Sequence, residues 1–427
     1  MDEVRQYKAT DFAREILQII DLEDCDYLRT GVIKREIGGM IAYPRQRDHG
    51  SHTLYNWLLG WYFYTHSSEI RGEIRNAIEL RKWKSSIISS DIFFGHVWQY
   101  VSLLHDVGYI FEGSLSAMNP AVYNEQVGLG IEIVADYLNS RFWYGSGIVS
   151  SHDRELIQEE LKVRNPQLNK MMSLAQTADA LRNLGDLSEL TNGLFKQLER
   201  RNSNILNFKK YESRSLPGDA FQLWQTHFEI FGFKKAKVII DELDEKFREL
   251  YLRGTLSDGQ RILDHGVCSG LLLLLIATHY YRILYAAKKN RGTSQHAEVL
   301  TSFIDRITRY KYDAQFWWCG IVWGTGASAM HSLIQLGICG NQAGHRLRLT
   351  DEPLTFLGIL VDCLQEWDRY SVFPIPGADT LQATDVQLVR RSGKIVLKYG
   401  NKDRSIKVTK ALDKCLAGWR NLVVIEA

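Results

Sequence analysis

Apolar residues recur at helical spacing along most of the chain, and this pattern predicts a mainly α-helical protein. Two strongly apolar helices are expected over residues 55–64 and 92–107. Between them, residues 69–84 are charged and amphipathic, so they are expected to cover a surface. Strongly apolar helices return at residue 267 and continue through residue 362. Only seven prolines occur in 427 residues, which is typical of a chain whose helices have few interruptions.

Changes in the character of the sequence divide the chain into five segments. Residues 155–260 are richer in charge than their surroundings, and they are interpreted as a helical insertion between two halves of one helical core. The predicted segments are a helical lead-in over residues 1–40, which ends in a turn at Gly38 and Gly39, a first core half over 41–154, the insertion over 155–260, a second core half over 261–372 and an appendage over 373–427.

The appendage departs from the helical pattern. Residues 385–389 and 394–399 alternate apolar and polar side chains on either side of a Ser-Gly turn, which predicts a β-hairpin. An amphipathic helix is expected over residues 409–422. The expected fold class is therefore mainly α, with a small β/α appendage at its C-terminal end.

Composition and charge narrow the classes of partner. The formal net charge of +2 gives no global attraction to nucleic acid or to acidic membranes, so a nucleic-acid partner is not expected without a local basic patch. The longest apolar run, residues 267–287, carries polar residues at helical spacing. It is therefore expected to be a buried helix and not a membrane span. No membrane partner is predicted.

The six cysteines are scattered and form no CxxC pair, so they are expected to be reduced thiols, most of them buried. The N-terminal residues lack the basic-then-apolar pattern of a secretory signal. Together these features predict a cytoplasmic protein.

The chemistry is concentrated at His105 and Asp106, which stand at the end of an apolar stretch in the sequence LLHDVGY. Burying an imidazole beside a carboxylate without a partner is costly. A metal ion removes that cost, because the two adjacent side chains offer it a nitrogen and an oxygen. The pair is therefore predicted to bind metal.

The LLHDVGY segment resembles the defining motif of HD-superfamily phosphohydrolases. The resemblance implies an all-helical core that holds one or two metal ions. It also implies a further histidine ligand upstream and an aspartate ligand on a late helix, with additional histidines between them in two-metal members.

Candidates for these ligands occur in the expected order. His52, in His-Thr-Leu before an apolar helix, resembles the upstream ligand; His49 lies three residues earlier and is given a role beside the metal or toward substrate. His265 lies at the start of the helix that contains the apolar run 267–287, and His331 lies on another apolar stretch. Both are predicted metal ligands. Arg47 is the cation nearest in sequence to the first histidine and is a candidate phosphate contact.

Two aspartates compete for the late position. Asp362 interrupts an apolar run, so its charge needs compensation, whereas Asp179 can be solvated or paired with Arg182 three residues on. We favour Asp362, because it leaves His265 and His331 inside the same core. Should Asp179 be the ligand, the core would close early and residues 155–260 would belong to it.

The predicted metal ligands are thus His52, His105, Asp106, His265, His331 and Asp362. Mixed nitrogen and oxygen ligands suit one or two ions of Mn, Fe, Co or Ni, with Mg also allowed. The expected activity is hydrolysis of a small phosphate ester or anhydride, with a nucleotide as the expected substrate and His105, Asp106, His49 and Arg47 as its catalytic residues. Two other classes stay open, a di-metal oxygenase and a nucleotide-sensing module without turnover.

Overall fold

The computed structural model describes most of the predicted core. The described residues are 2–19, 22, 25–40, 49–81, 88–111, 133, 152, 155, 219–253, 264–292, 297–310, 316–338, 346–365, 386–391 and 394–427. They are mainly helical and carry a small sheet region near the C-terminal end, which confirms the predicted fold class at this level.

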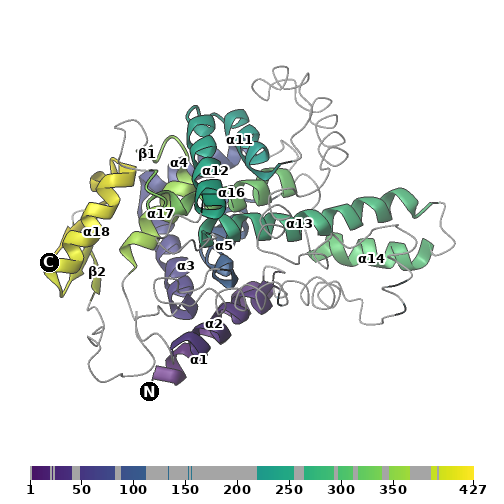
Figure 1. Cartoon of the computed structure of the whole chain (residues 1–427), viewed down its shortest axis with the longest axis horizontal. Helices are drawn as coiled ribbons and strands as arrows, with labels where there is room; N and C mark the ends of the chain where they lie inside the picture. The colour runs from purple at the N-terminus through teal and green to yellow at the C-terminus, as the bar shows by residue number, and fades with distance from the viewer. Residues whose placement is uncertain are drawn as a thin grey trace.

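Helices make up the first part of the described chain (Figure 1). In chain order they are α1 (Asp2–Ile19), α2 (Asp26–Met40), α3 (His49–His66), α4 (Ser68–Arg81), α5 (Ser90–Val101) and the short 3-10 helix η2 (Val107–Ile110). The predicted turn at Gly38 and Gly39 is wrong, because both glycines lie in the last turn of α2. Glycine weakens a helix without preventing it, and near a helix end the cost is small.

The second part contains α13, the longest of the described helices. The helices are α11 (Ala220–Ile230), α12 (Ala236–Arg253), α13 (His265–Asn290), α14 (Ala297–Tyr310), the π-helical turn η7 (Trp317–Ile321), α16 (Val322–Met330), the 3-10 helix η8 (His331–Leu333), α17 (Pro353–Leu364), α18 (Lys402–Cys415) and the 3-10 helix η9 (Trp419–Asn421). Among the described residues, no helix is both long enough and apolar enough to cross a bilayer.

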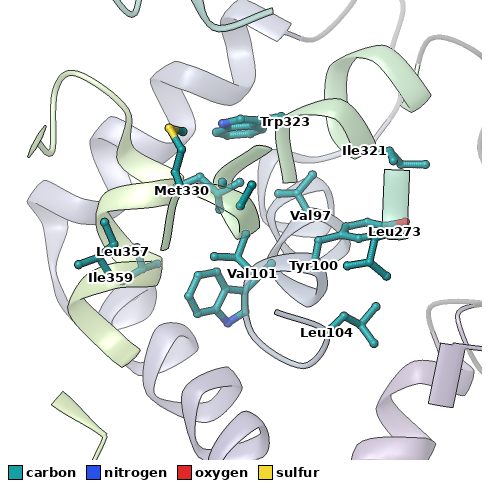
Figure 2. Packing of buried hydrophobic residues seen from close by; sticks show 14 of the residues in the cluster. Val97, Tyr100, Val101, Leu104, Leu273, Ile321, Trp323, Met330, Leu357 and Ile359 are labelled. Atoms are coloured by element: carbon teal, nitrogen blue, oxygen red, sulfur yellow. The ribbon is translucent and has the colours of Figure 1, made fainter. Parts of the chain in front are cut away.

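The core lies where α5, α13, α16 and α17 meet. Figure 2 shows Val97 of α5, Trp323 and Met330 of α16 and Leu357 of α17 gathered around one interior, and all four are fully buried. Burial of a side chain of this size stabilises the fold by roughly 1.5–3 kcal/mol. Gly270 lets α13 approach α16 closely, because a Cβ there would lie only 2.6 Å from the carbonyl oxygen of Thr325.

The helix expected to run to residue 107 ends at Val101. The hydroxyl of Ser102 donates to the carbonyl oxygen of Trp98 (2.6 Å), and the chain then turns before η2 begins. The apolar pattern gave no sign of this turn, because Leu103 and Leu104 within it are as buried as residues of the helix. His105 and Asp106 therefore lie in a turn between two short helices.

The C-terminal region is a three-stranded sheet packed against α18. Strands β2 (Val386–Arg391) and β3 (Lys394–Tyr399) form the predicted antiparallel hairpin, and β5 (Val423–Glu426) pairs in parallel with β3. A second, two-stranded pairing joins β1 (Leu347–Arg348) in parallel to β4 (Leu416–Ala417).

The predicted bounds of the last helix, residues 409–422, are wrong at both ends. The side chain of Asn401 accepts a hydrogen bond from the backbone N–H of Arg404, so α18 already begins at Lys402. It ends at Cys415 because β4 pairs with β1, and Gly418 then adopts a left-handed conformation (φ 80°). These determinants are tertiary contacts and a cap outside the amphipathic stretch.

Helix α11 of the predicted insertion packs directly on the core. The indole N–H of Trp224 in α11 donates to the hydroxyl of Thr325 in α16 (3.2 Å), and Phe228 of α11 is fully buried. Helix α12 lies beside α11 (Figure 1). The division into a core and an insertion stays a prediction, since residues 156–218 and 254–260 lie outside the described residues.

Cys415 takes part in a disulfide, so the expectation of six reduced thiols is wrong at this position. Four other described cysteines carry reduced thiols, and three of them, Cys25, Cys268 and Cys319, are buried as expected.

A buried polar cluster ties α4, α11 and α16 together. Arg81 of α4 is 5% exposed, and its guanidinium carbon lies 3.9 Å from the centroid of the Trp323 ring. Its Nε donates to Nε2 of His227 (3.3 Å), a histidine that is fully buried. Burial, and then the positive charge of Arg81, lower the pKa of His227 well below 6.5, so His227 is neutral in the folded protein.

This neutral histidine makes stability depend on pH. In the unfolded chain His227 gains a proton as pH falls below 6.5 while the folded form does not, so the free energy of unfolding falls by up to about 1.4 kcal/mol per pH unit. We expect His227→Gln to lose this contribution. Urea unfolding at pH 7 and pH 5 should then show a smaller loss of stability in the variant than in the wild type. Equal losses would contradict the assignment.

Candidate metal centre

The N-terminal half of α3 supplies the first part of the site. His52 and Asn56 are four residues apart, so their side chains lie on the same face of the helix, and both are buried. Arg29 of α2, itself buried, donates from Nη2 to the carbonyl oxygen of Gly50 (3.0 Å). This contact fixes the first turn of α3 against α2 and thereby positions His52.

The turn after α5 supplies the second part. Nδ1 of His105 donates to the carbonyl oxygen of Ser102 (2.6 Å), which leaves the lone pair on Nε2 of His105. On the other side of Asp106, the backbone N–H of Gly108 donates to the hydroxyl of Ser269 in α13 (2.7 Å). The His-Asp pair is thus fixed from both sides, and η2 is held against α13.

The remaining two histidines lie at the ends of core helices: α13 begins at His265, and α16 ends just before His331. His265 is the first residue of α13, where the side chain of Asp264 caps the helix by accepting from the N–H of Val267 (2.8 Å). His331 follows the last turn of α16, and its Nδ1 donates to the carbonyl oxygen of Ser328 (2.5 Å). This bond again leaves Nε2 as the atom with the lone pair.

The C-terminal end of α17 places a side chain at each ring nitrogen of His52. Oδ1 of Asp362 lies 2.8 Å from Nε2 of His52 and 3.7 Å from Nε2 of His105. One turn later, Oε1 of Gln365 accepts a hydrogen bond from Nδ1 of the same His52. Gln365, the residue that follows α17, therefore sets the orientation of the His52 ring, and Asp362 in the last turn of α17 supplies the anion that faces it.

These side chains form two groups of three whose ligand atoms all lie within 4.8 Å of one another. We call them the His52 triad (His52, His105 and Asp106) and the His265 triad (Asp106, His265 and His331). Asp106 belongs to both. Its Oδ2 lies 3.8 Å from Nε2 of His52, and its Oδ1 lies 3.2 Å from Nε2 of His105 and 3.8 Å from Nε2 of His265. One carboxylate thus stands between two sets of imidazoles.

The donor set fits metal ions. Nε2 of His105 and Oδ2 of Asp106 are buried without a hydrogen-bond partner among the described residues, which costs about 1–3 kcal/mol for each atom when nothing compensates it. With metal–ligand bonds of about 2.0–2.2 Å, neighbouring ligand atoms lie about 3 Å apart. Oδ1 of Asp106 is 3.2 Å from Nε2 of His105, and the Asp106 oxygens are 3.8 Å from Nε2 of His52 and of His265. A cation in each triad would satisfy both atoms.

The protonation states also suit metal binding. Burial alone would raise the pKa of Asp106 and of Asp362, but the neighbouring histidines, His105 first, hold both below their usual range. Burial lowers the pKa of His331 to about 4, so this ligand is neutral at pH 7. Burial also opposes protonation of His105, yet the charge of Asp106 raises its pKa. Protons and metal therefore compete at His105, and metal binding should weaken as pH falls.

Tyr109 connects the cluster to His49. Its ring stacks on His265, with centroids 4.0 Å apart and planes inclined by 10°, and it lies 4.0 Å from the ring of His49. The His49 ring centroid is 6.4 Å from that of His52, and His49 is part of neither triad. Burial lowers the pKa of His49 to about 3, so it is a neutral imidazole at the edge of the cluster.

The structure brings together all six residues proposed from the sequence as ligands, namely His52, His105, Asp106, His265, His331 and Asp362. Their binding of metal stays a prediction. Of the two competing aspartates, Asp362 lies against the His52 triad, whereas Asp179 is outside the described residues, as is Arg47.

Three neighbours of the cluster were not assigned from the sequence: Asn56, Tyr109 and Gln365. Asn56 offered a local signal, because it is a polar residue one turn after His52 in an otherwise apolar helix. Gln365 offered a similar one, three residues after Asp362. Neither signal shows which distant residue the side chain meets, and the contact between Gln365 and His52 spans 313 positions.

Comparisons of the chain with protein-family models, with curated proteins and with solved structures gave no match. The buried cluster of histidines and aspartates that could hold metal is the feature on which a function can be built.

Proposed function

We propose that the chain is a metal-dependent phosphohydrolase of the HD type, which cleaves a phosphate ester or anhydride and prefers a nucleotide substrate. The observation that carries this proposal is the shared carboxylate of Asp106, which lies between the His52 triad and the His265 triad. The resemblance of LLHDVGY to the HD motif supports it, since the motif supplies the His-Asp pair at the centre of the cluster.

In this proposal one cation is held by the His52 triad together with Asp362, and the other by the His265 triad. When bound, two divalent cations lower the pKa of a water molecule toward neutrality and offset the negative charge that develops on the phosphoryl oxygens. Histidine nitrogens and carboxylate oxygens favour Mn, Fe, Co or Ni, and Mg is also allowed.

The other residues around the metal positions would bind and orient the substrate. Asp362 is 20% exposed, whereas every other ligand is at most 6% exposed, so the substrate would approach from the side of Asp362. His49 is neutral at pH 7, so its ring can donate one hydrogen bond and accept another next to the cluster. Arg47, two residues before it in the sequence, would supply positive charge for the substrate phosphate.

The proposal is tested with the full chain, stripped of metal and then supplied with Mn²⁺, Co²⁺, Ni²⁺, Fe²⁺ or Mg²⁺. Nucleotides and p-nitrophenyl phosphates serve as substrates, and phosphate release, product mass and O₂ consumption are measured. We expect hydrolysis that requires metal and is abolished by chelation. Substrate oxidation coupled to O₂ consumption would replace the proposal with the oxygenase, and nucleotide binding without turnover would replace it with the sensing module.

A further inference from the structure

The amide side chain of Asn56 lies against Nε2 of His52 and Oδ1 of Asp362. It is 2% exposed, and one end of its amide lies 3.1 Å from Nε2 of His52 and 3.5 Å from Oδ1 of Asp362. The other end, Oδ1, is buried and has no hydrogen-bond partner among the described residues. The end that faces His52 and Asp362 therefore decides what Asn56 does.

If the amide nitrogen of Asn56 faces His52 and Asp362, the contacts among Asn56, His52 and Asp362 conflict. Nε2 of His52 and Oδ1 of Asp362 are only 2.8 Å apart, so a positive centre, either a proton or a metal ion, belongs between them. Because Nδ1 of His52 already donates to Gln365, the ring presents Nε2 to that centre. An amide N–H that points at the same centre brings two positive groups together, whereas an amide oxygen would be attracted.

A half-turn about the Cβ–Cγ bond of an asparagine exchanges the positions of Oδ1 and Nδ2 and leaves the shape of the side chain unchanged. The hydrogen-bonding neighbours therefore decide which position the oxygen takes. The half-turn places Oδ1 of Asn56 about 3 Å from Nε2 of His52, which is the spacing of neighbouring ligands around one metal ion. We infer that Asn56 is a further metal ligand, which binds through its amide oxygen to the cation of the His52 triad. This inference rests on the proposed metal centre.

The consequence is an unequal pair of metal positions. Asn56, Asp362 and the His52 triad give one cation five protein ligands, whereas the His265 triad gives the other cation three. The first position is therefore nearly filled by protein and holds its ion tightly. The second keeps most of its coordination positions open to water and to the phosphate of the substrate.

The test measures binding of Mn²⁺ and Co²⁺ to the metal-stripped full chain by calorimetry, without substrate. The wild type should show two sites. Asn56→Leu should weaken the tighter site by roughly 10- to 100-fold and leave the weaker one unchanged. Asn56→Asp should keep the tighter site at wild-type affinity or better, because it retains an oxygen and adds charge. The visible absorption of bound Co²⁺ should be altered in Asn56→Leu.

Gln99→Leu is the matched control, since Gln99 is a buried amide of α5 whose nitrogen donates to the carbonyl oxygen of Gly95. It should leave both sites unchanged. Wild-type affinity in Asn56→Leu would overturn the inference, as would an Asn56→Asp variant that binds as weakly as Asn56→Leu, because Asn56 would then act as a donor. An unchanged weaker site shows that each variant is folded. Two sites without any hydrolysis would sink the proposed activity and leave this inference standing.

Discussion

Asp106→Ala is expected to abolish binding of both metal ions, whereas loss of any other ligand should affect one. Asp106 is the only residue common to the two triads, and its oxygens face His52 on one side and His105 and His265 on the other. Hydrolysis should fall by more than the roughly 100- to 1,000-fold that follows the loss of a single transition-state contact. Metal content after dialysis and initial rates at saturating Mn²⁺ measure both effects.

His331→Ala is the comparison for this experiment, because His331 belongs to the His265 triad alone. It should bind one ion and not two. An Asp106→Ala protein that keeps two ions, or that loses only the ion lost in His331→Ala, would contradict the shared role of Asp106.

Gly108→Ala is expected to separate the two halves of the site. A Cβ at this position would lie 1.9 Å from the carbonyl oxygen of His265 and 2.7 Å from the backbone nitrogen of Ser269, and neither atom can move without shifting α13. Because η2 would have to withdraw from α13, we expect destabilisation of about 3 kcal/mol or more and loss of the ion at the His265 triad. Thermal unfolding and metal titration measure the two effects.

Gly72→Ala is the matched substitution, since a Cβ at Gly72 of α4 would meet nothing within 4 Å. In a helix this change should stabilise the protein by about 0.5–1 kcal/mol and leave metal binding unchanged. A Gly108→Ala variant as stable as Gly72→Ala, with both ions bound, would show that the close approach of η2 to α13 does not matter.

The sequence predicts the helices well where burial alone sets their pattern. The apolar run over residues 267–287 lies within α13, where Val267, Leu271 and Leu284 are buried, and the alternation over residues 394–399 becomes β3. Boundaries that depend on partners were not predictable. The end of α18 depends on the pairing of β4 with β1, and the end of α5 depends on Ser102, whose neighbours in the turn are as apolar as the helix.

The candidate site divides in the same way. His105 and Asp106 can be identified from the sequence, because an ionisable pair in an apolar stretch needs a compensating partner and because LLHDVGY resembles the HD motif. Asn56, Tyr109 and Gln365 do not, because an amide or a phenol in a helix is satisfied in many ways, and only the fold brings these side chains to the histidines. The amide and phenol side chains of the site are therefore recognised from geometry, whereas the His-Asp pair is recognised from its charge in an apolar stretch.

The most direct test of the metal centre is a crystal structure of the chain grown with Mn²⁺ and measured with anomalous diffraction. Two anomalous peaks are expected, one on each side of the carboxylate of Asp106, with the first within roughly 2.0–2.5 Å of Nε2 of His52 and Oδ1 of Asp362 and the second equally close to Nε2 of His265. Full occupancy at both positions would establish a two-metal centre. A cluster without anomalous density at saturating Mn²⁺, with His52 bonded directly to Asp362, would contradict it.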